Sequence, residues 1–427
     1  MIKIIKQNNQ RVLQGILQRS QFSYQEVNDL VANIMEEVKT KGDKALIAYT
    51  KDFDQVTLSN MKISKEMVNK AFDLVSEDLI EDIKKAKENL IRYHKQQIPN
   101  PYTVKENDRL LSQVIRPIER VGMYVPGGSA AYPSTVLMNA IPATLAGVEK
   151  LVMITPPQKD GIKASLLVAA ELAGVDEIYT IGGAQGIAAL TYGTESIPKV
   201  DKIVGPGNIY VSIAKQYASG IVGIDMVAGP SEILVLADED ANPAFIAADL
   251  MGQAEHDKLA SAICITTSST LAVQIKEELK KQIEAMPRRD IIKESLANYG
   301  AIIVVDSMEE GINFVNTLAP EHLELSLKNP EQYLGQIKHA GAIFLGEYTP
   351  EPVGDYFAGS NHTLPTSQTA RFASPLGVYD FIKRTSLVQY NKKALVEDAP
   401  SIIRLAEEEG LFAHANAIKV RLEEEDK

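Results

Sequence analysis

One pattern dominates the sequence between residues 121 and 345: a short apolar run, a turn that contains glycine, and then a helix, repeated along the chain. The runs that we expect as strands are residues 151–155, 177–181, 202–204, 232–237, 262–266, 302–305 and 342–345. Consecutive strands joined by helices usually pair in parallel, because a parallel pair needs a long crossover connection. The pattern therefore predicts an α/β fold in which helices cover parallel sheets.

The length of the chain and one turn divide this fold into parts. At 427 residues the chain is too long for a single hydrophobic core. Gly-Pro-Ser at 229–231 interrupts the pattern, so we expect two Rossmann-like parallel-sheet modules with small helical segments at both ends of the chain. A capping box at Ser23 and Glu26 starts the first long helix, and another is expected at residues 76–94. An N-terminal arm, residues 1–22, and a C-terminal tail, residues 375–427, are expected at the two ends.

Composition argues against several classes of partner. The apolar and charged fractions, 45% and 23%, are typical of a folded soluble protein. A formal charge of −12 argues against nucleic acid and anionic membranes, because both require a basic surface. The polar N-terminus and the absence of a long apolar run lead us to expect a cytoplasmic protein. The single cysteine, Cys264, lies in an apolar run and is expected to be a buried core residue without a disulfide partner.

The six histidines are the most informative residues for locating candidate catalytic and metal-binding sites. His94 and His339 lie in charged stretches and are expected at the surface. Gln253 and His256 lie three residues apart near the end of a helix that starts at Pro243. Residues at this spacing share a helix face, so an amide oxygen and an imidazole nitrogen can bind one metal ion there. A solvated helix end is the alternative interpretation.

Two more histidines accompany carboxylates. Glu321 and His322 stand together where a helix ends and a strand begins, and such a pair suits proton transfer near neutral pH. The alternative is a turn with two solvated groups. Because a strand alternates its faces, use of both side chains requires irregular local geometry. Asp355 and His362 lie in a segment rich in proline and glycine, residues 348–365, which we expect to be a long functional loop rather than a disordered one.

The last histidine, His414, lies in the C-terminal tail, which we expect to be helical from about residue 375. An acidic run that includes Glu409 precedes Gly410, and this order is typical of a helix end. From this segment alone, a solvated acidic helix is the simplest interpretation.

Glycine turns beside expected strands are the signal for a cofactor. Gly-Gly at 127–128, Gly-Gly at 182–183 and Gly-Pro-Gly at 205–207 are places where backbone N–H groups and a helix dipole can hold an anion. None completes the dinucleotide fingerprint G-x-G-x-x-G, because Tyr210 occupies the third glycine position of the closest match. The residues alone therefore indicate an α/β enzyme with a metal site.

Taken together, these motifs resemble the histidinol dehydrogenase family over nearly the whole chain. The matching runs are 121–129 (VGMYVPGGS), 181–185 (IGGAQ), 205–208 (GPGN), 228–232 (AGPSE), 253–256 (QAEH), 319–324 (APEHLE), 354–356 (GDY), 360–362 (SNH) and 409–414 (EGLFAH). Two departures, Gly252 where the family commonly has serine and Ser360 where it has threonine, remove no proposed ligand atom.

The resemblance implies a set of site residues. The implied zinc ligands are Gln253, His256, Asp355 and His414, and the implied catalytic acid–base pair is Glu321 and His322. The implied substrate residues are Ser231, Gln253, His256, His322, Asp355, His362, Glu409 and His414, and the implied NAD contacts are Tyr124, Gln185 and Asn208. Residues 122–232 would then be the NAD-binding domain and residues 23–121 with 233–374 the metal and catalytic domain. The family is an intertwined homodimer, so Glu409 and His414 are expected to complete the partner's site.

The resemblance also implies the reaction. The family oxidises L-histidinol through L-histidinal to L-histidine, the last steps of histidine biosynthesis, with zinc and NAD as cofactors. Water would be the nucleophile in the second step, since Cys264 is expected in a strand interior. The alternatives are a related zinc-dependent dehydrogenase that acts on another amino or sulfonated alcohol, a non-enzymatic zinc-binding protein, and an aldehyde dehydrogenase with a cysteine nucleophile.

Overall fold

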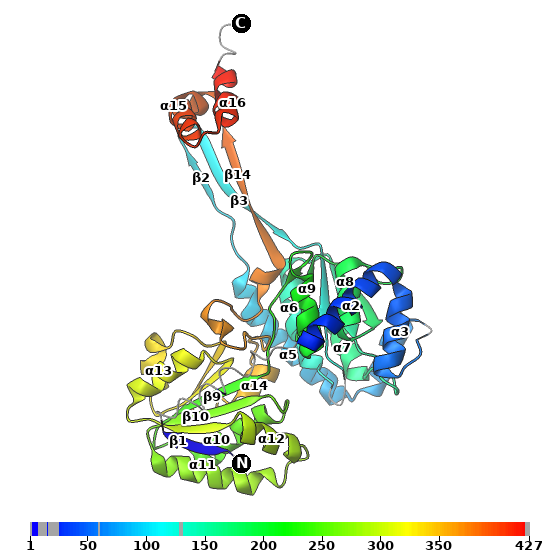
Figure 1. Ribbon diagram of the computed structural model, residues 1–427, viewed down its shortest axis with the longest axis vertical. Helices are drawn as coiled ribbons and strands as arrows, with labels where there is room; N and C mark the ends of the chain where they lie inside the picture. Colours follow the sequence, from blue (N-terminus) through cyan, green and yellow to red (C-terminus); the bar gives the residue numbers. More distant parts are fainter. Residues whose placement is uncertain (1, 7–14, 16–24, 59, 128–130, 423–427) are drawn as a thin grey trace. The chain divides into compact units, whose positions relative to one another are not determined.

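The structure is a computed structural model that describes residues 2–6, 15, 25–58, 60–127 and 131–422. Its contacts divide the chain into two compact units, Met1–Ile98 with Ile118–Phe381 and Pro99–Pro117 with Ile382–Lys427. The elements of both units are labelled in Figure 1. None of the helices in the described ranges is long and apolar enough to cross a membrane.

The first unit contains a five-stranded sheet in which every neighbouring pair is parallel. Its strands are β4 (Arg120–Tyr124), β5 (Lys150–Thr155), β6 (Glu177–Thr180), β7 (Lys202–Val204) and β8 (Gly223–Ile224), in the order β6-β5-β4-β7-β8. The helices that follow β4, β5, β6 and β7 are α6 (Pro133–Ala146), α7 (Ala164–Ala173), α8 (Gly183–Tyr192) and α9 (Ile209–Ala218). The prediction of parallel strands joined by helices is confirmed here.

A six-stranded sheet, also parallel throughout, follows along the chain. Its strands are β1 (Lys3–Lys6), β9 (Glu232–Ala237), β10 (Ser261–Thr266), β11 (Ala301–Val304), β12 (His322–Ser326) and β13 (Ala342–Leu345), in the order β1-β11-β10-β9-β12-β13. Its helices are α10 (Pro243–Ala254), α11 (Ser269–Ile283), α12 (Arg289–Asn298) and α13 (Met308–Leu318). Buried clusters cover both faces of the sheet, which explains why its strands read as continuous apolar runs.

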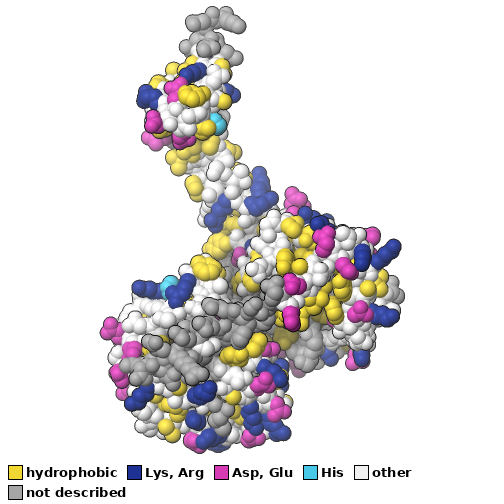
Figure 2. Space-filling view, viewed as in Figure 1, with side chains coloured by type: hydrophobic (Ala, Val, Ile, Leu, Met, Phe, Trp, Pro, Cys, Tyr) yellow, Lys and Arg dark blue, Asp and Glu magenta, His cyan; other side chains and the backbone are white. Residues whose placement is uncertain are grey.

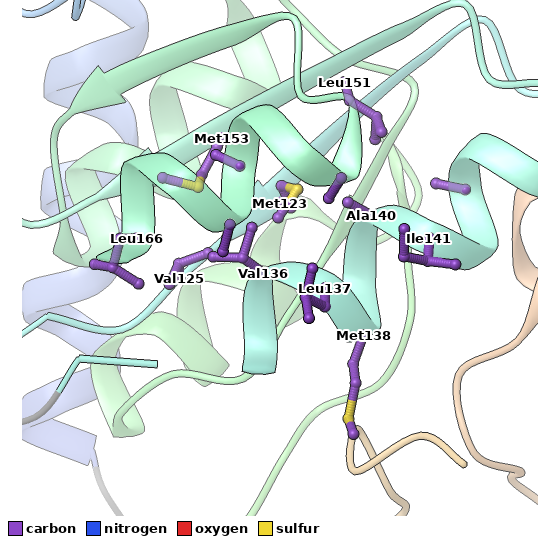
Figure 3. Packing of buried hydrophobic residues seen from close by; sticks show 14 of the residues in the cluster. Met123, Val125, Val136, Leu137, Met138, Ala140, Ile141, Leu151, Met153 and Leu166 are labelled. Atoms are coloured by element: carbon purple, nitrogen blue, oxygen red, sulfur yellow. The ribbon is translucent and has the colours of Figure 1, made fainter. Parts of the chain in front are cut away.

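The N-terminal helices cover the five-stranded sheet. They are α2 (Gln25–Lys41), α3 (Asp43–Asp54), α4 (Lys65–Ala71) and α5 (Glu77–His94). Buried side chains of α2 share one cluster with α8 and α9, and those of α5 share another with α6 and α7. Figure 3 shows the part of the second cluster where Met123 and Met153 of the sheet meet Val136 and Leu137 of α6. The predicted domain that joins residues 23–121 to residues 233–374 separates these helices from the sheet that they cover, and the domain boundaries stay a prediction.

The second unit is an antiparallel sheet with two helices. Its strands are β2 (Thr103–Glu106), β3 (Arg109–Pro117) and β14 (Ile382–Tyr390), in the order β14-β3-β2, and its helices are α15 (Lys392–Glu408) and α16 (Phe412–Leu422). Asn107 and Asp108, both with positive φ, form the two-residue turn between β2 and β3. Arg109 joins β3 to α15 through Asp398, with both nitrogen–oxygen distances at 2.8 Å.

Several expectations are corrected. The tail is not wholly helical, since β14 is a nine-residue strand, and the N-terminal arm contributes the strand β1. His94 is fully buried rather than at the surface, with its Nδ1 2.9 Å from Gln97 Oε1. The expected loop at 348–365 contains a helix, α14 (Glu351–Tyr356). Ser23 of the capping box and residues 128–129 of the first motif lie outside the described residues.

Short 3-10 helices complete the first unit: η1 (Phe72–Leu74), η2 (Lys95–Gln97), η3 (Pro330–Gln336), η4 (Thr369–Arg371) and η5 (Val378–Phe381). Side chains cap the starts of helices in this unit, among them α10 and α13. Asn242 caps α10 by accepting from Ala244 N, and Ser307 caps α13 by accepting from Glu310 N. These caps are local side-chain-to-backbone contacts, which a sequence pattern can predict.

Candidate active site

Glu321 and His322 converge on the backbone of Glu232. Helix α13 ends at Leu318, Ala319 takes a left-handed conformation, and β12 begins at His322 beside the start of β9. Glu232 N donates to Glu321 Oε2 at 2.8 Å, and His322 Nδ1 lies 3.1 Å from Glu232 O. Because Glu321 lies in the turn before the strand, both side chains reach the same place. This is the irregular geometry that use of both residues requires.

The hydrogen bond of His322 determines which of its nitrogens can react. A carbonyl oxygen can only accept, so Nδ1 carries a proton and donates it to Glu232 O. In the neutral ring the other nitrogen, Nε2, then has a free lone pair. Nε2 is buried, has no hydrogen-bond partner among the described residues, and lies 3.4 Å from Asp355 Oδ1. It can therefore accept a proton or bind a metal ion.

Carboxylates surround His322. Glu351 and Asp355 lie one turn apart on α14, so they share a helix face. His322 Nδ1 lies 3.9 Å from Glu351 Oε1 and 3.7 Å from Glu321 Oε2. Burial lowers the pKa of His322, but the charges of Glu351, Glu321 and Asp355 outweigh it and raise the pKa well above the usual value.

The pKa values of the acids follow from the same environment. Burial raises the pKa of Glu321 to about 8, with a smaller opposing effect from His322. Burial also raises the pKa of Glu351, to about 7. For Asp355 the desolvation is outweighed by His322 and by the two other histidines nearby, so its pKa is lowered. Asp355 is thus the carboxylate most suited to stay charged beside a cation.

Gln253 and His256 approach this cluster from the end of α10. This helix follows β9 and returns to the amino edge of the sheet, where β9 and β12 begin. Gln253 is fully buried, and in the amide orientation that satisfies its neighbours it donates to Glu351 Oε1 at 2.6 Å and Oε2 at 2.8 Å. His256 remains accessible to water; desolvation by its surroundings lowers its pKa, and the charge of Asp355 opposes this effect.

His362 closes the cluster on the side of α6. Its Nδ1 lies 3.1 Å from the carbonyl oxygen of Asp355, and its Nε2 lies 3.1 Å from Thr135 Oγ1. Burial lowers the pKa of His362 despite the charge of Asp355, which favours the neutral ring. Nδ1 then donates to the carbonyl, and Nε2 accepts from the Thr135 hydroxyl.

The donor set fits a zinc ion. Metal-ligating atoms of His322, Glu351 and Asp355 lie within 4.8 Å of one another. Asp355, whose pKa is lowered, is the member of this group most suited to stay charged, and zinc accepts carboxylate oxygen as a ligand. Of the four ligands that the sequence predicts, Asp355 belongs to this group and Gln253 contacts its member Glu351. His256 lies near enough for its charge to interact with that of Asp355. His414 and Glu409 are exposed residues of the second unit, so their contribution stays a prediction.

The three predicted cofactor residues surround the carboxyl edge of the five-stranded sheet. Tyr124 ends β4, and its hydroxyl accepts from Gly183 N at 3.4 Å. Gln185 lies in the first turn of α8, and its buried Oε1 has no partner within the described ranges. Asn208 caps α9 after β7 by accepting from Val211 N at 3.2 Å. The chain leaves β4 toward β5 and β6 on one side and returns at β7 on the other, which is a topological switch point where α/β proteins bind ligands.

One pocket lies between the turn after β7 and the catalytic candidates, although Tyr124, Gln185 and Asn208 are not among the residues that line it. It has a volume of about 120 Å³ and is lined by the Gly205–Gly207 turn on the cofactor side and by Ser231, Glu321 and His362 on the catalytic side. A ligand in this pocket would therefore touch Glu321 and the turn after β7 at once.

Comparisons with known proteins identify the family of the chain. The sequence profile of histidinol dehydrogenase matches residues 17–422. A histidinol dehydrogenase from Clostridium acetobutylicum is 54% identical over 426 residues, which is 99% of each chain. Another, from Listeria innocua, is 55% identical over 410 residues, which is 96% of each chain. The chain belongs to the histidinol dehydrogenase family.

A solved structure of the histidinol dehydrogenase family agrees over the same length. The crystal structure of histidinol dehydrogenase from Elizabethkingia anophelis has a TM-score of 0.94 and 41% identity, and the match covers 100% of this chain and 99% of that one. Membership of the histidinol dehydrogenase family, which the motifs predicted, is thus confirmed.

One member of the site was missed by the sequence analysis. Glu351 contacts Gln253 and faces His322, yet its segment was interpreted as a loop. Two signals were available: Pro350 and Pro352 are residues that start helices, and Glu351 precedes Asp355 by one helical turn.

Proposed function

We propose that the protein oxidises L-histidinol through L-histidinal to L-histidine with zinc and two NAD⁺. As a member of the histidinol dehydrogenase family the protein is an oxidoreductase. The observation that carries the proposal is the shared pocket, because it puts Glu321 and Ser231 within reach of the turn after β7. We also propose the cytoplasm as its location, since its one cysteine is buried and unpaired.

The cofactors would be held by separate groups. Gln253, His256, Asp355 and His414 would bind zinc, which when bound supplies a template for the amine and imidazole of the substrate. Tyr124, Gln185 and Asn208 would bind NAD, which when bound supplies the hydride acceptor. Ser231 and His362 would contact the substrate, with His362 oriented by Thr135 and by the carbonyl of Asp355.

The proposed proton transfers follow from the contacts of His322 and Glu321. The neutral form of His322 would accept the hydroxyl proton of the alcohol at Nε2, since Nδ1 donates to Glu232 O and cannot accept it. The nearby carboxylates raise the pKa of His322, and a zinc ion bound to Asp355 would oppose this effect and favour the neutral form. Glu321 would then remove a proton from the water that adds to the aldehyde. A pKa of about 8 supports this role, because a base is most effective when its pKa lies near the operating pH.

We further propose a homodimer in which Glu409 and His414 complete the partner's site. Both residues are exposed, and the same unit exposes large apolar side chains, among them Leu405 and Phe412, each 67% exposed. Figure 2 shows apolar side chains at the surface of the described helices and strands of this unit. Apolar surface of this kind is typical of a protein interface.

The test is an NADH assay with L-histidinol before and after chelation. We expect two NADH per histidinol, loss of activity on chelation and recovery with zinc, because the metal positions the substrate. The double variant Glu321→Ala, His322→Ala should still bind zinc but form no NADH. Turnover of simple diols at the same rate as histidinol would contradict the proposed substrate, and metal-independent turnover would contradict the role of zinc.

A further inference from the structure

A buried ion pair stands at the edge of the pocket, outside the proposed catalytic groups. Lys215 lies in α9 and Asp225 follows β8, and their side chains are 2% and 1% exposed. Both residues line the pocket. Removing two charges from water is unfavourable, so a buried pair is weak as a source of stability and often has another role.

The ion pair binds both polar groups of Gly205. Lys215 Nζ donates to Gly205 O at 2.9 Å, and Gly205 N donates to Asp225 Oδ2 at 2.8 Å. Gly205 has a φ of +105°, which residues with a side chain rarely adopt, and a Cβ there would overlap the carbonyl of Tyr124. The pair therefore holds the first residue of the turn against the end of β4.

This turn forms the cofactor side of the pocket. It runs from Gly205 to Asn208, which caps α9, and Gly205 and Gly207 both line the pocket. In many dinucleotide sites the backbone N–H groups of such a turn bind phosphate. Here the N–H of Gly205 already donates to Asp225. Gly205 therefore cannot offer this N–H to a phosphate, and its contribution is the backbone shape of the turn.

The substrate side has anchors besides the ion pair, although Met226 N also donates to Asp225 Oδ1 at 2.6 Å. The segment after Asp225 leads to Ser231 and has three hydrogen bonds of its own. These are Ser212 Oγ to Ala228 O at 2.8 Å, Gly229 N to Thr366 Oγ1 at 2.6 Å, and Ser261 N to Ser231 O at 3.0 Å. Loss of the ion pair should consequently disturb the cofactor side and spare the substrate side.

We propose that the Lys215–Asp225 ion pair is a positioning device for the cofactor: it holds Gly205 so that the turn to Asn208 keeps the shape that binds the dinucleotide. The inference rests on the proposed function, since it assumes that NAD binds at this edge. Neither side chain is a catalytic residue; each acts through the turn.

The experiment compares Lys215→Met and Asp225→Asn with the wild type in the zinc-loaded protein. Lys215→Met removes the ammonium group, and Asp225→Asn keeps an oxygen that can accept from Gly205 N. The matched control is Lys202→Met. Lys202 lies in β7, in the same unit as Lys215, and forms a partly buried ion pair with Asp380. It is not among the residues that line the pocket.

The readouts are the dissociation constants of NADH, by fluorescence titration, and of L-histidine, by calorimetry without cofactor, together with thermal unfolding. We expect NADH affinity to fall by about tenfold or more in either variant, because even a small displacement of a binding group weakens its contacts with the ligand. L-Histidine affinity should stay within about twofold of the wild type, because its anchors are separate. If Lys215→Met does not fold, Asp225→Asn alone decides the question.

Two results would overturn the inference alone. One is NADH affinity no lower than that of the Lys202→Met control. The other is an equal loss of NADH and L-histidine affinity, which would indicate a general structural role. A wild-type protein that forms no NADH from L-histidinol would overturn the proposed function and this inference with it.

Discussion

At the scale of single residues, the backbone of Glu232 positions two neighbouring side chains through two different hydrogen bonds. Its N–H binds Glu321 and its C=O binds His322, so one peptide segment orients an acid and a base. A further carboxylate, Glu351, binds the amide of Gln253 through both of its oxygens. The chemistry of the site therefore depends on backbone and carboxylate contacts as much as on the groups that meet the substrate.

Glu321→Gln should separate the two half-reactions. If Glu321 activates water, this variant should slow oxidation of L-histidinal by about a hundredfold or more while oxidation of L-histidinol changes little. In the wild type the second step should accelerate as the pH rises toward about 8, because the carboxyl must lose its proton before it can act as a base. The variant should lack this dependence. Stopped-flow measurement of NADH with each substrate provides both results.

The control for this prediction is Cys264→Ala. Cys264 is fully buried in β10, and burial raises the pKa of its thiol, so it is a poor nucleophile. This variant should retain both half-reactions. Selective loss of aldehyde oxidation in Cys264→Ala would contradict the water mechanism.

At the scale of elements, the two parallel sheets contribute their site residues from opposite edges. Tyr124 and Asn208 follow the carboxyl ends of β4 and β7, whereas Glu321 and His322 lie at the amino end of β12, beside the start of β9. Segment 225–231 leads from one sheet to the other, and its residues line the pocket between the cofactor turn and the catalytic pair. The short helix α14 then brings two more carboxylates to this edge.

Gly354→Ala should test how tightly α14 is held. A Cβ at Gly354 would lie 2.6 Å from Phe344 Cε1, and the Phe344 ring is buried beside His322 with its centroid 6.0 Å away. Overpacking of this kind destabilises by about 1–3 kcal/mol. We expect a lower melting temperature and weaker zinc binding in a chelator competition, because α14 carries Asp355.

Gly335→Ala is the matched control. Gly335 lies in η3, and no atom of the described residues lies within 4 Å of the place that a Cβ would take, so a methyl group there meets open space. Its melting temperature and zinc affinity should match the wild type. Equal behaviour of the two variants would show that α14 tolerates displacement.

At the scale of the whole molecule, the proposed site needs residues from both compact units. Gln253, His256 and Asp355 belong to the first unit, and Glu409 and His414 to the second. A homodimer in which the second unit serves the partner's site would make each subunit incomplete by itself.

Co-expression of two inactive variants would test this arrangement. His322→Ala damages the first unit and His414→Ala the second. If His414 acts in the partner's site, mixed dimers have one intact site, and random pairing should restore about a quarter of the wild-type activity. If it acts within its own subunit, no activity should return. Each variant expressed alone is the control, and size-exclusion chromatography with light scattering measures the assembly.

The sequence by itself determined the α/β class, most strand positions and the family. Residues 232–237, for example, were predicted as a strand and form β9, because apolar runs, caps and glycine turns act through near neighbours. The same local logic predicted Glu321 and His322 as a pair. It missed the strands of the second unit, because β2 and β14 are largely exposed and β3 is only partly buried, although the Asn-Asp turn before β3 was a usable signal.

Only the tertiary structure decided which distant residues meet. Several features join residues that are far apart in the chain. They are the order of the strands, the burial of His94, the contact of Glu351 with Gln253, and the hydrogen bonds of Lys215 and Asp225 to Gly205. No local pattern carries this information, because a lysine or a glutamate has the same sequence signature whether it is solvated or buried with a partner. The physical reason is that the free energy of such groups depends on their surroundings, which exist only once the chain has folded.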